Sequence, residues 1–172
     1  MSQQGKLEGI SKPRRIKHSF TQSIKGTREQ VFPLLCPVRE SDWIPGWTTD
    51  WVITNSGVAE LDCMFQTPPR SEAGGAASIW VITRHDVEAF KVEMLKVTPG
   101  FTIGKLQISL SAQARNMTNA TIAYEFTSLG PLGDEYLEGF TMQWYEKFMR
   151  VWEDQMNHHL ATGELIMALA EH

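Results

Sequence analysis

The sequence predicts an α+β fold in which a curved, seven-stranded antiparallel sheet wraps a long C-terminal helix, with two short helices after the first strand. Two observations indicate this fold class. Residues 15–129 alternate apolar and polar side chains in short runs, as strands do, and residues 136–160 carry bulky apolar side chains at four-residue steps, as one face of a helix does. That helix face must be covered, and an antiparallel sheet with one apolar face can cover it.

The first expected elements are a strand and two short helical pieces. Arg15–Ile24 alternates apolar and polar residues and is expected to form the first strand. Thr27 offers a hydroxyl that can cap a short helix over Arg28–Leu35. This helix should end before Pro37, because the residue before a proline disfavours helical backbone. A second helical piece is expected at Val38–Asp42.

Six further strands are expected between turns that contain Gly, Pro, Asn or Asp. Their ranges are Trp51–Asn55, Asp62–Gln66, Ala77–Arg84, Ala89–Val97, Phe101–Gln113 and Thr118–Leu129. His85-Asp86 is expected to turn the chain after the third of these, and Arg115-Asn116 to close a hairpin between the last two. The last two strands alternate cleanly, which predicts a sheet with one buried and one exposed face.

A single long helix is expected to follow, capped by Asp134 and ending near Thr162-Gly163. Its apolar ridge comprises Phe140, Trp144, Phe148, Trp152, Met156 and Leu160. A four-residue step advances about 400° round a helix, so the ridge drifts by about 40° per step and the helix should be covered on more than one side. Because large rings seldom fill the space under a curved sheet completely, we expect a cavity between sheet and helix.

Length and composition fit one ordered domain. The chain has 172 residues, of which 42% are hydrophobic and 21% charged, and a domain of this size can bury a sufficient core without disulfides or metals. We expect a flexible tail at residues 1–14 and a single domain at residues 15–172. Residues 1–28 hold seven Lys and Arg and one acid, but such short basic runs are usually solvated, so no nucleic-acid partner is expected.

The two cysteines, Cys36 and Cys63, lack the spacing of a disulfide framework or zinc site and favour a reducing, cytoplasmic location. No run approaches the roughly 18 consecutive apolar residues of a membrane span, and Met1–Ile10 has no signal-peptide core. No glycine loop indicates phosphate binding, and Asp154 with His158 supplies too few ligands for a metal. We therefore expect neither a cofactor nor a metal, and a homodimer is left open.

Four segments carry a resemblance to a known family. They are FTQSIKGTREQVFPLL (Phe20–Leu35), SDWIPGW (Ser41–Trp47), SIWVITRHD (Ser78–Asp86) and YEFTSLGPLGDE (Tyr124–Glu135). In this order they resemble the START-like (SRPBCC) superfamily, with its helix-grip fold, and within it the polyketide cyclase and aromatase branch. The superfamily also includes plant hormone-binding pollen-allergen relatives and steroid or lipid transfer domains. The resemblance covers about Ile16 to Gly163.

The resemblance implies a hydrophobic pocket between the concave face of the sheet and the terminal helix, and it transfers no catalytic residue. The side chains expected to line this pocket are Trp43, Trp47, Trp80, Arg84, Met94, Tyr124, Trp144, Phe148 and Trp152. Trp80 and Arg84 are included because they share one phase of a predicted strand, and Met94 and Tyr124 because they take the inward phases of later strands.

Two polar residues of this set each allow two interpretations. Arg84 either belongs to a solvated strand end with His85, or points inward and holds a ligand carboxylate, phenolate or enolate with its planar donors. Tyr124 is either a core residue whose hydroxyl is satisfied or a hydrogen-bond donor to a ligand oxygen. No Ser, His and acid combination supports nucleophilic catalysis.

Three functions follow from these expectations. The leading one is binding or transport of a small hydrophobic or aromatic molecule, such as a lipid, a sterol or a polyketide-like compound, in an internal cavity. The alternative is a cyclase, aromatase or dehydratase in which Arg84 or Tyr124 stabilises an enolate in the same cavity. A third is a protein-interaction module whose cavity is filled by side chains. Whether the protein is an enzyme is left open.

Overall fold

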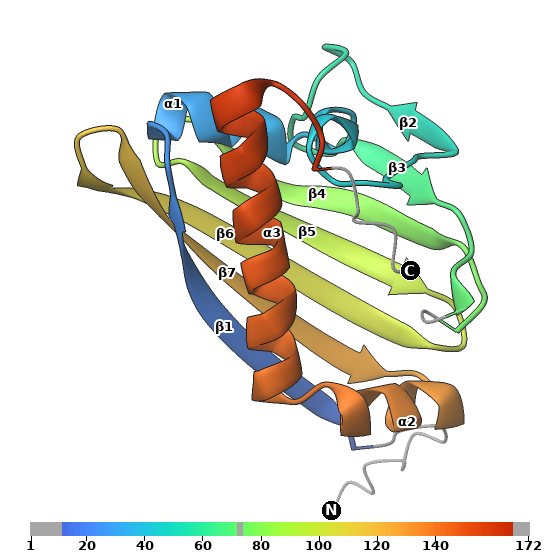
Figure 1. Cartoon of the computed structure of the whole chain (residues 1–172). Coiled ribbons are helices and arrows are strands. Elements are labelled where there is room, and N and C mark those ends of the chain that lie inside the picture. The colour runs from blue at the N-terminus through green and yellow to red at the C-terminus, as the bar shows by residue number, and fades with distance from the viewer. Residues whose placement is uncertain (1–11, 72–73, 167–172) are drawn as a thin grey trace, which may run out of the picture.

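A computed structural model of the chain describes residues 12–71 and 74–166. Within these residues the strands form one seven-stranded antiparallel sheet in the order β1-β7-β6-β5-β4-β3-β2. The strands are β1 (Arg15–Ile24), β2 (Trp51–Ile53), β3 (Met64–Thr67), β4 (Ser78–Asp86), β5 (Lys91–Thr98), β6 (Thr102–Ala114) and β7 (Met117–Ser128). Figure 1 shows the sheet curving round helix α3 (Met142–Thr162), which crosses its concave face. The predicted fold class is confirmed.

Short helical segments follow β1, as the sequence predicts. They are α1 (Arg28–Val31) and the 3₁₀ helices η1 (Phe32–Leu35) and η2 (Arg39–Asp42). Thr27 caps α1, because its hydroxyl accepts a hydrogen bond from the Gln30 N–H at 3.3 Å while the Gln30 side chain accepts one from the Thr27 N–H at 2.9 Å. The buried side chains of α1 and η1 cover one end of the concave face.

The predicted single terminal helix is in fact two helices. Helix α2 (Pro131–Gly139) ends at Phe140, whose backbone is not helical, and α3 starts immediately after Thr141. The Thr141 hydroxyl accepts a hydrogen bond from the Trp144 N–H at 3.2 Å and so provides the N-cap of a new helix. Asp134 lies in the first turn of α2 and does not cap a continuous helix. The apolar ridge is therefore divided between two elements.

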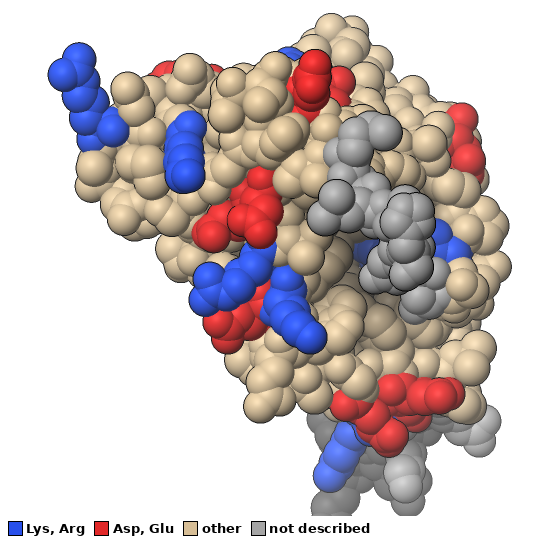
Figure 2. Space-filling view, in the orientation of Figure 1, with Lys and Arg blue, Asp and Glu red and all other residues tan. Residues whose placement is uncertain are grey.

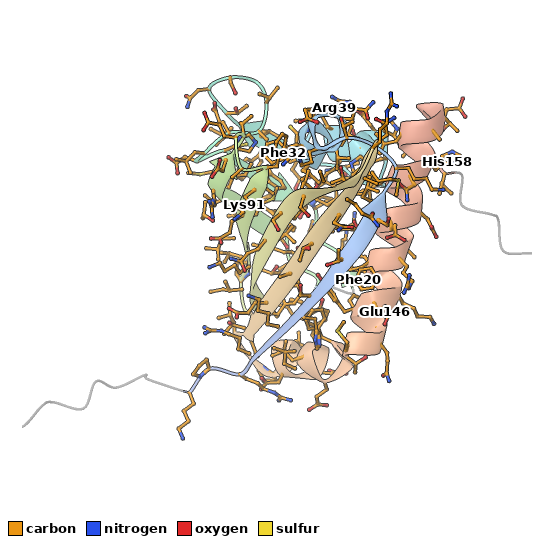
Figure 3. All side chains as sticks on the ribbon, turned by 90° about the vertical axis from the view of Figure 1, so that its left-hand side faces the viewer. Phe20, Phe32, Arg39, Lys91, Glu146 and His158 are labelled. Atoms are coloured by element: carbon orange, nitrogen blue, oxygen red, sulfur yellow. The ribbon has the colours of Figure 1, made fainter. Side chains whose placement is uncertain are left out.

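Polar bonds hold α3 beside the edge strand β1. The Gln22 side chain donates to the Met149 carbonyl at 2.7 Å, and the Ser23 N–H donates to the Glu153 carboxylate at 2.6 Å. One turn later, the Asn157 side chain donates to the Ser23 carbonyl at 3.1 Å. Figure 3, seen from the β1 edge, shows this strand running beside α3. The helix is thus fixed near one side of the sheet, and space remains toward the strands on the other side.

A bulge in β4 changes which side chains face inward. Pairing with β5 shifts between Ile82 and Arg84, and a bulge of this kind interrupts the regular alternation of side chains. Trp80 and Ile82 are buried, Arg84 is exposed, and His85 packs against Phe32 with ring centroids 5.2 Å apart. The predicted turn directly after Arg84 is wrong, because β4 continues for two more residues.

Two expectations from composition can be compared with the structure. Cys36 and Cys63 are buried free thiols. Across residues 12–71 and 74–166, no helix has both the length and the apolar character needed to cross a membrane. Residues 1–11 of the expected N-terminal tail lie outside the described residues.

Candidate functional site

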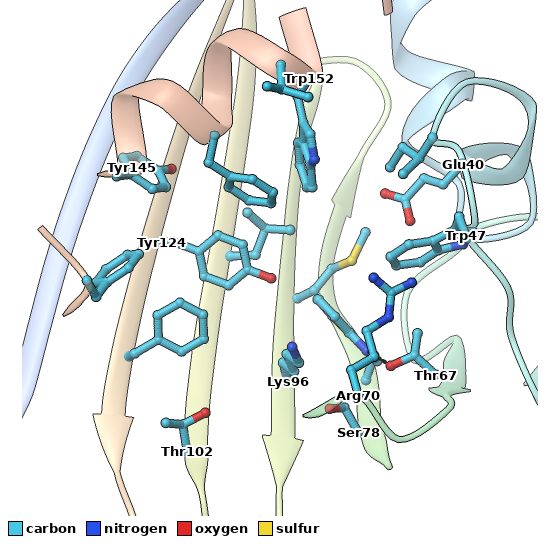
Figure 4. Close-up of a pocket in the computed structure, with 18 of the residues that line it drawn as sticks. Glu40, Trp47, Thr67, Arg70, Ser78, Lys96, Thr102, Tyr124, Tyr145 and Trp152 are labelled. Atoms are coloured by element: carbon cyan, nitrogen blue, oxygen red, sulfur yellow. Dashed lines mark hydrogen bonds between the residues drawn. The ribbon is translucent and has the colours of Figure 1, made fainter. Parts of the chain in front are cut away.

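A cavity of about 380 Å³ lies between the concave face of the sheet and α3, within the range of roughly 300–1,000 Å³ that is typical of small-molecule sites. Strands β3 to β7 supply one wall, through Thr67, Ser78, Trp80, Met94, Lys96, Thr102, Leu106, Tyr124 and Phe126. The facing wall comes from η2, the loop after it, α2 and α3, through Glu40, Ile44, Trp47, Tyr136, Phe140, Trp144, Tyr145, Phe148, Trp152 and Gln155. Figure 4 shows this arrangement.

Aromatic side chains are 11 of the 24 residues that line the cavity, and their rings support one another. Trp144 stacks on Phe148 with centroids 5.2 Å apart, and Phe148 lies 5.1 Å from Trp152. On the sheet, Tyr124 stacks on Phe126 at 4.7 Å. Such contacts add about 0.5–1.5 kcal/mol per pair beyond burial. The rings are therefore held in place by one another before any ligand enters. The empty cavity can then stay open, because the rings do not need contacts across it.

Exposed lining residues mark the mouth of the cavity. They are Pro45, Arg70, Trp144 and Val151, which come from the loops near β2 and β3 and from the outer side of α3. Figure 2 looks onto this side and shows the surface hollowed beside α3, with Lys or Arg side chains at the hollow. Arg70 donates to the Gly46 carbonyl at 3.3 Å, and the Lys96 ammonium lies 5.1 Å from the centroid of the Trp80 ring. Two cationic side chains, Arg70 and Lys96, thus lie among the residues that line the cavity.

Several polar groups of the wall are already hydrogen-bonded within the protein. The hydroxyls of Ser78 and Thr98 lie 2.7 Å apart, and the Trp80 indole donates to the Thr67 hydroxyl at 3.1 Å. These bonds fix the wall formed by β3, β4 and β5. They leave these side chains less free to bind a ligand than groups that have no protein partner.

Glu40 is the most unusual polar group of the cavity. It is only 4% exposed, and Figure 4 shows its carboxylate pointing into the cavity beside Trp47. Among the described residues no donor lies within hydrogen-bond distance of this carboxylate. Burial away from water disfavours the charged form and raises the pKa of the Glu40 carboxyl well above its usual range. A buried carboxyl group whose surroundings favour the protonated form thus faces the ligand space.

Tyr124 is the second polar group that faces the cavity without a protein partner among the described residues. Burial is the largest cause that raises the pKa of its phenol, and Tyr136, Glu40 and Tyr145 add to the effect. Its hydroxyl therefore stays protonated and can donate one hydrogen bond and accept others. By contrast, the Tyr145 hydroxyl is used within the fold, where it donates to the Ile122 carbonyl at 2.8 Å.

Most of the residues predicted to line the pocket meet in this cavity. Seven of them do so, namely Trp47, Trp80, Met94, Tyr124, Trp144, Phe148 and Trp152. Trp43 lies behind the wall, 2% exposed, with its indole donating to the Leu34 carbonyl at 2.9 Å. Arg84 faces solvent and pairs with Asp86 at 3.0 Å, because the β4 bulge turns it outward. The inward position predicted for Arg84 is wrong, and ligand binding by the other residues stays a prediction.

The three charged residues that line the cavity, Glu40, Arg70 and Lys96, were not predicted from the sequence. Lys96 could have been found, because it follows Met94 by two residues and so shares its inward strand phase. Glu40 gives no such signal, since it lies in a short helical segment between charged residues and is buried only through tertiary packing. Arg70 lies in the connection after β3, where periodicity says nothing about side-chain direction. Within residues 12–71 and 74–166, no group of three or more His, Cys, Asp and Glu is arranged to hold a metal ion.

Comparisons with known proteins identify the fold. No protein-family model matches the chain, and no curated protein matches its sequence. Norcoclaurine synthase from Thalictrum flavum superposes with a TM-score of 0.64 and 10% identity, over 94% of this chain and 99% of that one. A putative uncharacterized protein from Rhizobium leguminosarum gives 0.61 and 9%, over 87% and 97%. Ara h 8.0201 gives 0.59 and 12%, over 87% and 100%.

These likenesses cover nearly the whole of each chain at very low identity, so they establish the architecture and leave the activity open. They agree with the strand order and the position of α3 described above. The chain therefore has the helix-grip fold that the sequence predicts and that these solved structures share.

Proposed function

We propose that the protein binds a small aromatic or otherwise hydrophobic molecule in the cavity between the sheet and α3. The observation that carries this proposal is a ring-lined space of about 380 Å³ into which Glu40 and Tyr124 point without hydrogen-bond partners in the described part of the chain. Apolar walls with a few convergent polar groups are typical of ligand sites. The rings supply most of the buried contact, and Tyr124 orients a ligand oxygen in place of Arg84, which lies outside.

A ligand panel tests this function. Fatty acids, sterols and polyphenols are added to the purified protein, and the midpoint of thermal unfolding is measured together with tryptophan fluorescence. A ligand at about 100 times its dissociation constant should stabilise the native state by about 2.7 kcal/mol. It should also quench fluorescence, because Trp47, Trp80, Trp144 and Trp152 line the cavity. Absence of both effects across the panel would exclude the proposal, and native mass spectrometry of co-purifying molecules would name the natural ligand.

A second candidate function is catalysis of proton transfer in the same cavity, as in a polyketide cyclase, aromatase or dehydratase. The observation that favours it is Glu40, since a buried carboxyl with a raised pKa is suited to general acid or base catalysis near neutral pH. Tyr124 could hold an enolate oxygen through its hydroxyl. With a polyketide-like substrate, Glu40→Gln and Tyr124→Phe should then lower turnover far more than binding. Unchanged turnover in both variants would remove this assignment.

A further inference from the structure

We propose that Glu40 gives the cavity a binding site for the ammonium group of an aromatic amine. This refinement rests on the ligand-binding function proposed above and specifies the chemical class of the ligand. The two oxygens of the Glu40 carboxylate are hydrogen-bond acceptors, and an ammonium group is a compact set of donors with the opposite charge. The aromatic walls of the cavity then contact the rest of the ligand.

The backbone of η2 fixes Glu40 in its inward position. Its N–H donates to the Cys36 carbonyl at 2.9 Å, and its carbonyl accepts from the Ile44 N–H at 2.8 Å. The neighbouring charges of the same turn, Arg39 and Asp42, pair with each other on the outside at 2.5 Å. Arg39 is therefore paired with Asp42 and does not neutralise Glu40. The Arg39–Asp42 ion pair thus lies on the solvent side of η2, and the Glu40 side chain lies on the cavity side.

Among the residues that the structure describes, none donates a hydrogen bond to the Glu40 carboxylate. Trp47 beside it uses its indole N–H on the Pro37 carbonyl at 2.7 Å, so it presents ring atoms to the cavity. Ile44 and Trp152 complete this part of the wall. An unpaired acid in such surroundings is costly to bury, and a ligand that supplies the missing donors removes that cost. Ring faces also attract cations, which favours an ammonium over a neutral donor.

The other charged and titratable groups around the cavity do not supply the positive charge that Glu40 lacks as a partner. Arg70, from the loop after β3, is exposed and donates to a backbone carbonyl, while Lys96, from β5, lies over the Trp80 ring. Burial is the only cause found for the raised pKa of Glu40, so neither cation offsets it. The phenols of Tyr124, Tyr136 and Tyr145 remain neutral because burial raises each pKa. Glu40 is thus the acidic group available to an ammonium.

This assignment predicts release of a proton on binding. In the empty cavity the protonated form of Glu40 is favoured, because burial raises the pKa of the carboxyl. An amine ligand arrives already protonated, and its ammonium pairs with the ionised carboxylate. The proton of Glu40 passes to the buffer. Affinity for the amine should therefore rise with pH until Glu40 is ionised in the free protein or the amine loses its own proton.

Three probes of similar shape separate this inference from general binding. They are 1-naphthylmethylamine, 1-naphthylmethanol and 1-methylnaphthalene, titrated calorimetrically into the protein at pH 7 in two buffers of different ionisation enthalpy. The amine should bind about tenfold more tightly than the alcohol, since hydrogen bonds to charged groups are the stronger class. Its apparent enthalpy should change between the buffers as expected for one released proton, whereas the enthalpies for the alcohol and the hydrocarbon should not.

Glu40→Gln keeps the size of the side chain and removes its charge. The variant should lose the preference for the amine and the proton release, while its affinity for the alcohol changes less than about twofold. Glu29→Gln, an exposed carboxylate outside the cavity, should behave like the parent protein. Proton release is measured on the parent protein itself, so the test does not depend on the folding of the variant.

The outcomes are distinct. Equal affinity for all three probes, or a preference for the amine that survives in Glu40→Gln, would overturn the assignment of Glu40 while leaving the ligand-binding function in place. If none of the three binds, the assignment fails, and the ligand panel described above decides whether the ligand-binding function fails with it. A preference for the amine that depends on Glu40 and releases one proton supports both.

Discussion

The interior between the sheet and α3 has two ends that differ in how they are filled. At the filled end, side chains of α1, η1, β1, β6, β7 and α3 leave about 10 Å³, at most the space that one water molecule needs. The residues around it are Gln22, Ile24, Val31, Leu35, Trp43, Ile108, Ala120, Ile122 and Met156, and Glu40 and Trp152 border both ends. At the hollow end, the same sheet and helix enclose about 380 Å³.

The difference shows what produces a cavity in this fold. At the filled end, α1 and η1 insert Val31 and Leu35 between the sheet and α3. At the hollow end no helix is inserted, since α2 and the loop after η2 supply only the borders. The rings there contact one another along each wall, and Phe126 also joins the two walls through Tyr136 and Phe140, with centroids 5.2 and 5.1 Å apart. A curved sheet and one helix therefore leave space unless a third element fills it.

The largest predicted effect is a difference in the free energy of unfolding between two Trp→Ala variants, one at each end of the interior. Trp43→Ala removes a ring that is 2% exposed and should lower the free energy of unfolding by about 3–5 kcal/mol. Trp144→Ala removes a ring that is 43% exposed at the mouth and should cost only about 1 kcal/mol, mainly its stacking on Phe148. Urea unfolding of both variants measures the difference. Equal losses would mean that the two ends are packed alike.

Adding volume at each end should have opposite consequences. Ala120→Leu at the filled end has no space to use and should destabilise the protein by about 1–3 kcal/mol. Leu106→Trp at the hollow end can extend into the cavity and should cost less than about 1 kcal/mol. Thermal and urea unfolding compare the two. A larger loss for Leu106→Trp would show that the cavity cannot accept a ring.

The hydroxyls of Tyr145 and Tyr124 allow the same comparison for single hydrogen-bonding groups. Tyr145→Phe deletes the bond to the Ile122 carbonyl and should destabilise the protein by about 1 kcal/mol. Tyr124→Phe deletes no protein bond, so the free energy of unfolding should change by less than about 0.5 kcal/mol. Its affinity for 2-naphthol should fall about fivefold, because the ligand oxygen loses its partner. A stability loss in Tyr124→Phe equal to that in Tyr145→Phe would place Tyr124 in the structural core.

Glu40, at the boundary of the two ends, should make stability depend on pH. Its pKa is raised by burial, so between the pKa of the unfolded chain and that of the native state only the native state binds this proton. Stability then falls as pH rises. Glu40→Gln removes this loss, so its free energy of unfolding should increase relative to the parent protein between pH 4.5 and pH 7. A difference that does not change with pH would contradict burial of the acid, and Glu29→Gln is the matched control.

The smallest predicted effect is at Arg84. Its ion pair with Asp86 is exposed, and such pairs contribute about 0–1 kcal/mol. Arg84→Ala should leave both stability and the affinity for 2-naphthol almost unchanged. A marked loss of affinity would show that Arg84 reaches the ligand after all.

Regular alternation predicted most of the fold, including the bounds of β1 and the hairpin between β6 and β7. Departures from regularity were missed. A bulge after Ile82 leaves no trace in the sequence pattern, yet it decides that Arg84 faces outward. Thr141 ends one helical run and starts another, although its apolar neighbours continue the ridge. Gly163, by contrast, ends α3 with a positive φ of 74°, as glycine at this place predicts.

The candidate site was predicted in part, for a similar reason. Rings on inward strand phases and on the terminal helix were found, because size and period indicate burial. Glu40 was not found, because an acid in a short helical segment is expected in solvent. The chemically most informative residue is the one whose position contradicts its local preference, and only tertiary structure reveals it.

The most direct test of this account is calorimetric titration of 1-naphthylmethanol into the parent protein and Leu106→Trp, with folding of the variant checked by its unfolding transition. If the hollow end is a ligand site, the parent protein binds one molecule per chain, and the folded variant, whose larger ring occupies part of the cavity, binds it more weakly. Undiminished binding by the folded variant would contradict the account, since the ligand would then lie outside the cavity.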